Sequence, residues 1–232
     1  MDVGGYVLAG GKSLRMGKDK ALLELAGRPL VQHAVVKVSR VCSEVHLLGN
    51  RNELSVYGPL VRDLHEGGGP LSGIESALED SRYDWNLFMP VDMPFLPTAF
   101  LGWWMPMALA REKDGMRMAM LTVDGRPQPA LCLLHKDVLP AVKTAVERGV
   151  FKLFRVFEET ERELLETKRD RSEVFFNLSW SVNQNFSVTA EGNDPWFSLT
   201  KKQEAARRLW FANLNTPEEF AEAQEFVEAL DT

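Results

Sequence analysis

Short apolar runs alternate with stretches of helical periodicity through the first half of the chain, and this alternation constrains the fold more than any other feature. Runs with the length of buried strands occupy residues 5–9, 45–49 and 86–90, and weaker ones occupy residues 118–123 and 130–134. Apolar residues recur at helical spacing from Leu30 to Val41, and residues 71–78 and 98–110 resemble two further helices. Such alternation predicts βαβ units and therefore an α/β fold, a three-layer sandwich around a mainly parallel, Rossmann-like sheet.

The second half of the chain has weaker periodicity. Short helices are expected at residues 138–146 and 151–158, and the charged run at 158–173 is interpreted as the solvated face of a helix. Residues 177–198 mix Asn, Ser, Gly and aromatic side chains without a clear period, which indicates an irregular excursion rather than a second domain. Two capping boxes, Thr200 with Gln203 and Thr216 with Glu219, mark the starts of the last helices.

Charge is distributed unevenly along the chain. The 232 residues carry a formal net charge of −6, which disfavours nucleic acid and anionic membranes as partners. Residues 1–40, however, hold seven basic against three acidic residues, a net charge of +4. An anionic ligand is therefore expected at the part of the molecule that this N-terminal segment builds.

No targeting or membrane-spanning segment is recognisable in the sequence. The apolar run at residues 6–9 is too short for the core of a signal peptide, and no stretch reaches the roughly 20 apolar residues that cross a bilayer. Cys42 and Cys132 lie in apolar contexts without a CxxC partner, which is typical of reduced, buried thiols. The cytoplasm is the expected compartment.

A glycine-rich, basic loop directly follows the first expected strand, with the sequence LAGGKSLRMGKDK at residues 8–20. Glycines let the backbone approach a ligand closely, and their N–H groups can face phosphate oxygens while Arg15, Lys18 and Lys20 neutralise charge. A Walker A loop ending at Gly11-Lys12-Ser13 would need glycine at position 6, where the chain has Tyr6. A GxGxxG dinucleotide fingerprint does not fit the spacing either. The loop therefore predicts phosphate binding of another kind.

The loop and the residues after it, through Gly27, Pro29 and Leu30, resemble the signature of the molybdenum cofactor guanylyltransferases (MobA-type) within the nucleotidyltransferase superfamily. The resemblance implies a sheet of the nucleotide-diphospho-sugar transferase type and a loop that holds a nucleoside triphosphate. The residues it assigns to nucleotide contact here are Leu8, Ala9, Gly10 and Gly11. It assigns the triphosphate itself to Arg15 and Lys20, as catalytic residues.

Two further segments match the family in order and spacing. Asn50, after the second strand, and Asp63 resemble the pair that contacts guanosine in the family. A carboxylate or carbonyl oxygen can accept hydrogen bonds from the N1–H and N2–H₂ groups of guanine. Without the resemblance, Asn50 would be a turn residue and Asp63 a surface charge. Gly69 lies in a segment that resembles the family's Gly-Pro-Leu-x-Gly element, which leads into a helix flanking the nucleotide.

Asp92 lies among prolines at the end of the third strand, in a segment that resembles the family's Pro-x-Asp-x-Pro-x-x-Pro pattern. In that family the aspartate is the Mg²⁺ ligand, so the resemblance implies Mg²⁺ as cofactor, with Asp92 as metal ligand and as a catalytic, nucleotide-binding residue. Mg²⁺ commonly takes only one or two protein carboxylates. The alternative, a helix N-cap, is better filled by Thr98.

The family's acceptor is molybdopterin, and two segments match its acceptor regions. Gln128 lies in a stretch close to a His-Pro-x-x-Ala-Leu element but in altered register, and Asn213 and Asn215 belong to a near-identical Asn-x-Asn-Thr-Pro element. Capping of the last helix is the structural alternative for these two asparagines. The resemblance also makes molybdoenzyme apoproteins or their chaperones candidate partners. It implies a single nucleotidyltransferase domain over 1–232, with an insertion at 157–210 that the family lacks.

The expected function is therefore that of an enzyme, a Mg²⁺-dependent guanylyltransferase. It would transfer GMP from GTP to molybdopterin, release pyrophosphate and form molybdopterin guanine dinucleotide. A molybdopterin cytidylyltransferase or a sugar-phosphate nucleotidyltransferase on the same fold is the alternative. A non-catalytic nucleotide-binding protein for cofactor delivery is a further alternative, from another functional class.

Overall fold

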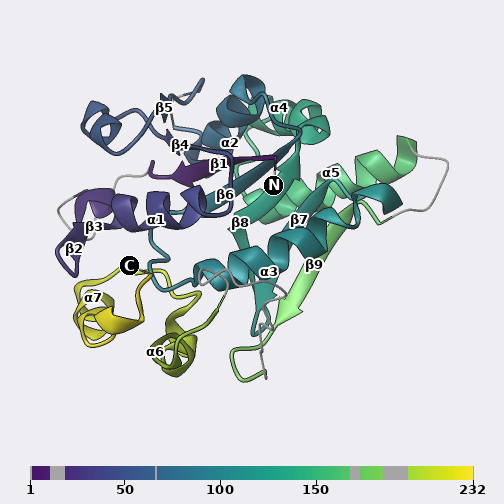
Figure 1. Cartoon of the computed structure of the whole chain (residues 1–232). Helices are drawn as coiled ribbons and strands as arrows, with labels where there is room; N and C mark the ends of the chain where they lie inside the picture. The colour runs from purple at the N-terminus through teal and green to yellow at the C-terminus, as the bar shows by residue number, and fades with distance from the viewer. Residues whose placement is uncertain (1, 11–18, 66, 168–172, 185–197, 232) are drawn as a thin grey trace.

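A seven-stranded mixed sheet forms the centre of the computed structural model, which describes residues 2–10, 19–65, 67–167, 173–184 and 198–231 (Figure 1). Its strands are β1 Val3–Leu8, β4 Glu44–Leu48, β5 Leu60–Val61, β6 Trp85–Pro90, β7 Met118–Val123, β8 Arg126–His135 and β9 Phe175–Trp180. Their order across the sheet is β5-β4-β1-β6-β8-β7-β9. Strands β5, β4, β1 and β6 are parallel, and so are β7 and β9, which confirms the predicted mainly parallel, Rossmann-like sheet.

Strand β8 runs antiparallel to both of its neighbours, β6 and β7. The cause is local, because β7 and β8 are joined by the two residues Asp124 and Gly125, with φ of +46° and +75°. Two positive φ values in a two-residue loop give the hairpin turn that matches the twist of paired strands. The first residues of β8 consequently lie at the edge of the sheet where β6 ends.

Helices cover both faces of the sheet, as the three-layer prediction requires. On one face lie α1 Leu30–Ser39 and α3 Thr98–Leu109, with α6 Lys201–Ala205 and α7 Pro217–Gln224 from the C-terminal part beside them (Figure 1). On the other face lie α2 Gly69–Asp80, α4 Leu139–Glu147 and α5 Leu153–Thr167. Side chains of β1 alternate between the two faces of the sheet. Val7 packs into the hydrophobic core beneath α1 and α3, whereas Tyr6 and Leu8 pack into the core beneath α2, α4 and α5.

Shorter elements connect these layers. A small hairpin is formed by β2 Glu24–Leu25 and β3 Arg28–Pro29. The 3-10 turns are η1 Lys20–Leu22, η2 Asn52–Val56, η3 Glu112–Asp114, η4 Lys136–Val138, η6 Arg207–Leu209 and η7 Val227–Ala229. Both predicted capping boxes are present, at the starts of α6 and α7.

The structure corrects the expectation for residues 177–198, because this stretch does not begin as an irregular excursion. Its first residues belong to β9, which pairs with β7 in parallel at the edge of the sheet. Phe176 and Trp180 are buried whereas Asn177 and Ser179 are exposed, and this alternation is the strand signal that the irregular composition concealed. Residues 185–197 lie outside the described residues.

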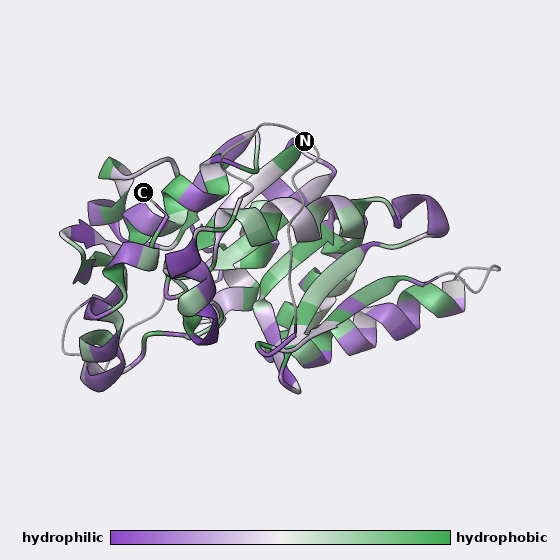
Figure 2. Cartoon of the chain, turned by 60° about the horizontal axis from the view of Figure 1, so that its bottom comes forward, coloured by the Kyte–Doolittle hydropathy of each residue, from purple (hydrophilic) through white to green (hydrophobic). Residues whose placement is uncertain are grey.

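Helix α5 is longer than the helix expected at residues 151–158, since it continues to Thr167 and includes the first ten residues of the charged run at 158–173. Glu158, Arg162, Glu163 and Glu166 are exposed, which confirms a solvated helical face over residues 158–167, whereas residues 168–172 lie outside the described residues. Figure 2 shows hydrophilic residues along much of α5 and predominantly hydrophobic ones in the central strands.

The first turn of α3 also differs from expectation. Thr98 is the first helical residue, and Pro97 occupies the N-cap without a side-chain hydrogen bond. Thr98 N and Oγ1 instead donate to Asp231 Oδ2 at 2.8 and 2.7 Å. A carboxylate distant in sequence therefore satisfies a free N–H group of the helix.

Two further sequence expectations concern thiols and membranes. Cys42 and Cys132 are free thiols, and burial raises the pKa of Cys42 to about 12. None of the helices in the described parts of the chain is long and apolar enough to cross a membrane.

Candidate active site

The carboxyl ends of β1, β4 and β6 meet at one edge of the sheet, where an open α/β sheet offers its ligand-binding crevice. Leu8 and Ala9 are buried there, and Gly10 is the first exposed residue after β1. Backbone hydrogen bonds fix this point, since Ala9 N donates to Leu48 O at 3.1 Å and Val91 N donates to Leu8 O at 3.2 Å. Two predicted site residues, Gly11 and Arg15, lie outside the described residues.

Lys20 is the centre of the best-defined polar cluster at this edge. Its Nζ donates to Asp92 Oδ2 at 2.5 Å and to Asn215 Oδ1 at 2.6 Å. The side chains of Lys20 and Asp92 are only 15% and 16% exposed, so their interaction is partly shielded from water. Three residues predicted from separate segments of the sequence therefore share one cluster.

Local structure explains how Lys20 and Asp92 reach each other. Asp19 caps η1 by accepting a hydrogen bond from Ala21 N at 2.9 Å, and Lys20 is the first residue of that turn. Asp92 follows β6, and its backbone carbonyl accepts a hydrogen bond from Leu214 N at 3.0 Å. The C-terminal segment is thereby attached to the backbone of Asp92 itself.

Asp92 has one carboxylate oxygen without a protein partner. Oδ1 is buried and accepts no hydrogen bond from any residue that the structure describes, while Oδ2 is held by Lys20. Buried polar atoms are normally hydrogen-bonded, so an orphaned carboxylate oxygen marks a position where a ligand can complete the coordination. Oxygen is also the ligand atom that a hard cation such as Mg²⁺ prefers.

Asn215 and Asn213 are brought to this edge by the capping box of α7. Glu219 Oε2 accepts hydrogen bonds from Asn215 N at 2.5 Å and from Thr216 N at 2.9 Å. Asn215 Nδ2 donates to Asn213 O at 3.0 Å. The N-cap of α7 is Thr216, so neither asparagine fills the capping role that was its structural alternative. No local pattern in the sequence predicts the contact between Asn215 and Lys20.

Asn50 and Asp63 form a second polar group, beside β4 and β5. Asp63 N donates to Asn50 Oδ1 at 3.0 Å, and Asn50 Nδ2 lies 3.4 Å from Asp63 Oδ2. A Cβ on Gly73 of α2 would lie 3.3 Å from Asp63 Oδ1, so the helix leaves little space behind this carboxylate. Burial raises the pKa of Asp63. The structure thus brings together the two residues that were predicted to contact guanosine.

Gly69 begins α2 in the conformation that only glycine adopts easily, with φ of +60°. The chain before it is attached to the helix, because Ser76 Oγ accepts a hydrogen bond from Leu64 N at 2.8 Å and Ser72 Oγ donates to His65 O at 2.8 Å. A Cβ on Gly69 would meet no atom of the described residues within 4 Å, so this part of the chain leaves space open on that side of the backbone.

Gln128 lies near the start of β8 and is half-buried. Because β8 is antiparallel to β6, this position falls at the same edge of the sheet as Asp92. Its side chain is 3.5 Å from Arg126 O and makes no hydrogen bond to Lys20, Asp92 or Asn215. Gln128 therefore shares the edge but not the cluster.

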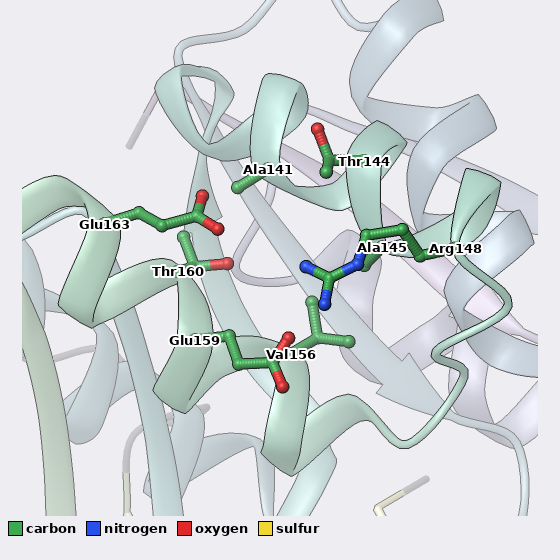
Figure 3. A pocket seen from close by; sticks show the side chains of 8 residues that line it. All are labelled: Ala141, Thr144, Ala145, Arg148, Val156, Glu159, Thr160 and Glu163. Carbon is green, nitrogen blue, oxygen red and sulfur yellow. The ribbon is translucent and has the colours of Figure 1, made fainter.

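Figure 3 shows a hollow between α4 and α5 whose lining includes none of the predicted site residues. It is lined by Ala141, Thr144, Ala145, Arg148, Val156, Glu159, Thr160 and Glu163. Among the described residues, no three His, Cys, Asp or Glu side chains cluster as a metal site would require, here or elsewhere.

Comparison with known proteins found a matching family and similar sequences. A family model, the MobA-like NTP transferase domain, matches residues 5–164. A molybdenum cofactor guanylyltransferase from Vibrio atlanticus is 34% identical over 178 residues, which cover 75% of this chain and 89% of the relative. One from Serratia proteamaculans is 34% identical over 161 residues, covering 66% and 77%.

Solved structures share the fold at lower identity. Molybdopterin-guanine dinucleotide biosynthesis protein A from Archaeoglobus fulgidus has a TM-score of 0.66 at 20% identity, covering 96% of this chain and 97% of that one. A 2-C-methyl-D-erythritol 4-phosphate cytidylyltransferase from Thermus thermophilus has a TM-score of 0.60 at 15% identity, covering 98% and 100%. With the family match over residues 5–164, the conclusion is that this chain is a nucleotidyltransferase of the MobA-like NTP transferase family.

Proposed function

We propose that this protein is a molybdenum cofactor guanylyltransferase, which transfers GMP from GTP to molybdopterin and releases pyrophosphate. The observation that carries the proposal is the cluster of Lys20, Asp92 and Asn215, which unites predicted nucleotide, metal and acceptor residues in a MobA-like chain. Curated relatives that are 34% identical to this chain are molybdenum cofactor guanylyltransferases.

Asp92 is the residue that would hold Mg²⁺. The fit is supported by its buried Oδ1, which no described residue hydrogen-bonds. When bound, the ion would neutralise phosphate charge and polarise the phosphoryl oxygens. A site with one carboxylate is sufficient, because phosphate oxygens and water commonly complete the octahedron around Mg²⁺.

The basic and glycine residues would bind the nucleotide. Lys20 and Arg15 would hold the triphosphate by charge, and backbone at Leu8, Ala9, Gly10, Gly11 and Gly69 would approach it closely. Asn50 and Asp63 would accept hydrogen bonds from the donor edge of guanine. Their contact with each other keeps both oxygen-bearing side chains in one place.

Gln128, Asn213 and Asn215 would bind the acceptor. A phosphate oxygen of molybdopterin attacks the α-phosphorus of GTP, a new P–O bond forms, and the bond to the β-phosphate breaks with departure of pyrophosphate. A phosphate monoester is already largely ionised near neutral pH, so the chain needs no general base. Alignment and charge stabilisation are the main requirements of such transfers.

Thermal unfolding with GTP, CTP or ATP, each with Mg²⁺, tests the nucleotide. A ligand that binds only the folded protein raises the melting temperature according to its affinity, so GTP should give the largest rise. Equal rises with all three nucleotides would contradict the guanosine assignment, and a larger rise with CTP would indicate a cytidylyltransferase.

Release of pyrophosphate tests the transfer itself. GTP, Mg²⁺ and molybdopterin together should yield pyrophosphate and molybdopterin guanine dinucleotide, whereas GTP without the acceptor should yield neither. Binding of GTP without any product in the complete mixture would identify a nucleotide-binding accessory protein instead.

A further inference from the structure

Arg51, which has no role in the assignments above, lies where the chain leaves β4 beside the end of β1. The two strands are parallel, with Leu8 opposite Leu48. Gly49 has φ of +151°, and a Cβ there would lie 3.4 Å from Gly10 N. The close approach at this glycine brings the next residues of the chain against the start of the glycine-rich loop.

The guanidinium of Arg51 joins two residues that flank residues 10–18. Its Nη2 donates to Ala9 O, and its Nη1 forms an ion pair with Asp19 Oδ2. The side chains of Arg51 and Asp19 are 31% and 19% exposed, so the pair is partly shielded from solvent. Water and salt therefore weaken this pair less than they weaken a pair on the open surface.

Asp19 connects Arg51 to Lys20. Asp19 Oδ2 pairs with the guanidinium of Arg51, and Asp19 Oδ1 accepts a hydrogen bond from Ala21 N. This second contact caps the turn that starts at Lys20. The planar fork of an arginine can serve two separate acceptors at once, which the single ammonium of a lysine does less well.

We propose that Arg51 is a positioning residue for the transfer reaction. By joining Ala9 to Asp19, it holds Lys20 at the place from which the ammonium group reaches Asp92. This role rests on the proposed function, because it concerns the residue that would hold the triphosphate.

Arg51→Met, Arg51→Lys, Asp19→Asn and the double variant Arg51→Met/Asp19→Asn test the role by steady-state kinetics of pyrophosphate release. An asparagine at position 19 can still accept from Ala21 N, so this change removes the charge and spares the cap. Arg82→Met is the matched control, since Arg82 pairs with Glu44 at the other end of β4 and is 68% exposed.

Both Arg51 variants and Asp19→Asn should lower kcat/KM for GTP by about tenfold or more, because small misplacements of a group that holds substrate are costly. The KM for molybdopterin should stay unchanged, whereas a generally loosened protein would raise it as well. The double variant should be no worse than the more impaired single variant, because both changes break the same link. Arg82→Met should match the wild type.

If the fold-losses of kcat/KM in the two single variants multiply in the double variant, the proposal is overturned, and Arg51 contacts the nucleotide directly. Wild-type values of kcat/KM for GTP in both Arg51 variants would also overturn the proposal. Circular dichroism and melting temperature identify a variant that fails to fold, and Arg51→Lys then supplies the comparison. A wild-type protein that releases no pyrophosphate would refute the proposed function, whereas normal release by the Arg51 variants would refute only the positioning role.

Discussion

The two carboxylate oxygens of Asp92 have different surroundings. Lys20 Nζ donates to Oδ2 at 2.5 Å, whereas Oδ1 is buried and receives no hydrogen bond from the parts of the chain that the structure describes. Leaving a buried acceptor unsatisfied costs about 1–3 kcal/mol. The folded protein therefore retains an oxygen that a cation could take, at a cost to its own stability.

Replacing Asp92 by asparagine tests this oxygen at the scale of one residue. Asp92→Asn keeps the size of the side chain and an acceptor for Lys20 but removes the negative charge, so transfer with Mg²⁺ should fall by about 100-fold or more. The melting temperature should change little. Asp84→Asn, an exposed aspartate just before β6 that pairs with Lys136, is the matched control. Undiminished transfer by Asp92→Asn would contradict the metal assignment.

At the scale of elements, the two capping boxes have different surroundings although their local geometry is the same. Thr200 Oγ1 and Thr216 Oγ1 each accept a hydrogen bond from the third helical residue, at 3.1 and 3.2 Å. The box of α7 also fixes the backbone of Asn215, through Glu219, and Asn215 contacts Lys20. The capping box that stabilises α7 thus also holds Asn215, a residue of the candidate site.

Thr200→Ala and Thr216→Ala separate these two effects. Each should lower the free energy of unfolding by about 1 kcal/mol, the usual cost of losing an N-cap, in urea titrations. Only Thr216→Ala should also reduce the rate of transfer, because Asn215 precedes that cap directly. If both variants reduce transfer equally, the loss reflects general destabilisation and the link from the cap to Asn215 is wrong.

At the scale of the whole molecule, Asp231 ties the C-terminal segment to both α1 and α3. Its Oδ2 accepts hydrogen bonds from Thr98 and from the buried Lys37, whose Nζ lies 3.0 Å away. Its Oδ1 accepts one from Gln203 Nε2 at 2.6 Å. Burial raises the pKa of Asp231, but the Lys37 charge and the Thr98 hydrogen bonds outweigh it, so the pKa is lowered.

A lowered pKa makes this contribution to stability dependent on pH. The stabilisation is fully present above the ordinary aspartate pKa of about 3.9 and is lost as the pH falls through the lower pKa of the folded state. Asp231→Asn should lower the free energy of unfolding at pH 7 by about 3 kcal/mol, because it leaves Lys37 buried without its counter-charge. Equilibrium unfolding from pH 3 to 7 should show a smaller dependence on pH for the variant than for the wild type.

Asp114→Asn is the control for that experiment, since Asp114 is exposed in η3. It should reproduce the wild-type profile. Parallel profiles for the wild type and Asp231→Asn would show that this carboxylate does not stabilise the fold through its charge.

Sequence patterns that act over a few residues predicted much of the fold. The buried strands β1 and β6 are recognisable as short, mainly apolar runs, and the capping boxes are recognisable from fixed residue spacings, because strand burial and helix caps depend on near neighbours. The alternation of Phe176, Leu178 and Trp180 carried the signal for β9, which its polar neighbours concealed. Resemblance to a family, rather than any local rule, suggested the roles of Asn50, Asp63, Asn213 and Asn215.

The order of apolar runs, helical patterns and glycines along the chain is sufficient to predict an α/β sandwich with a glycine-rich, basic loop after its first strand. Folding is required to bring Lys20 to Asp92, 72 residues away, and to Asn215, 195 residues away, and to bring Asp231 to the start of α3, where it takes the capping role. These contacts depend on strand order and on how the C-terminal segment packs across the sheet edge. Local spacing carries no information about either, since residues distant in sequence become neighbours only when the shared core is buried.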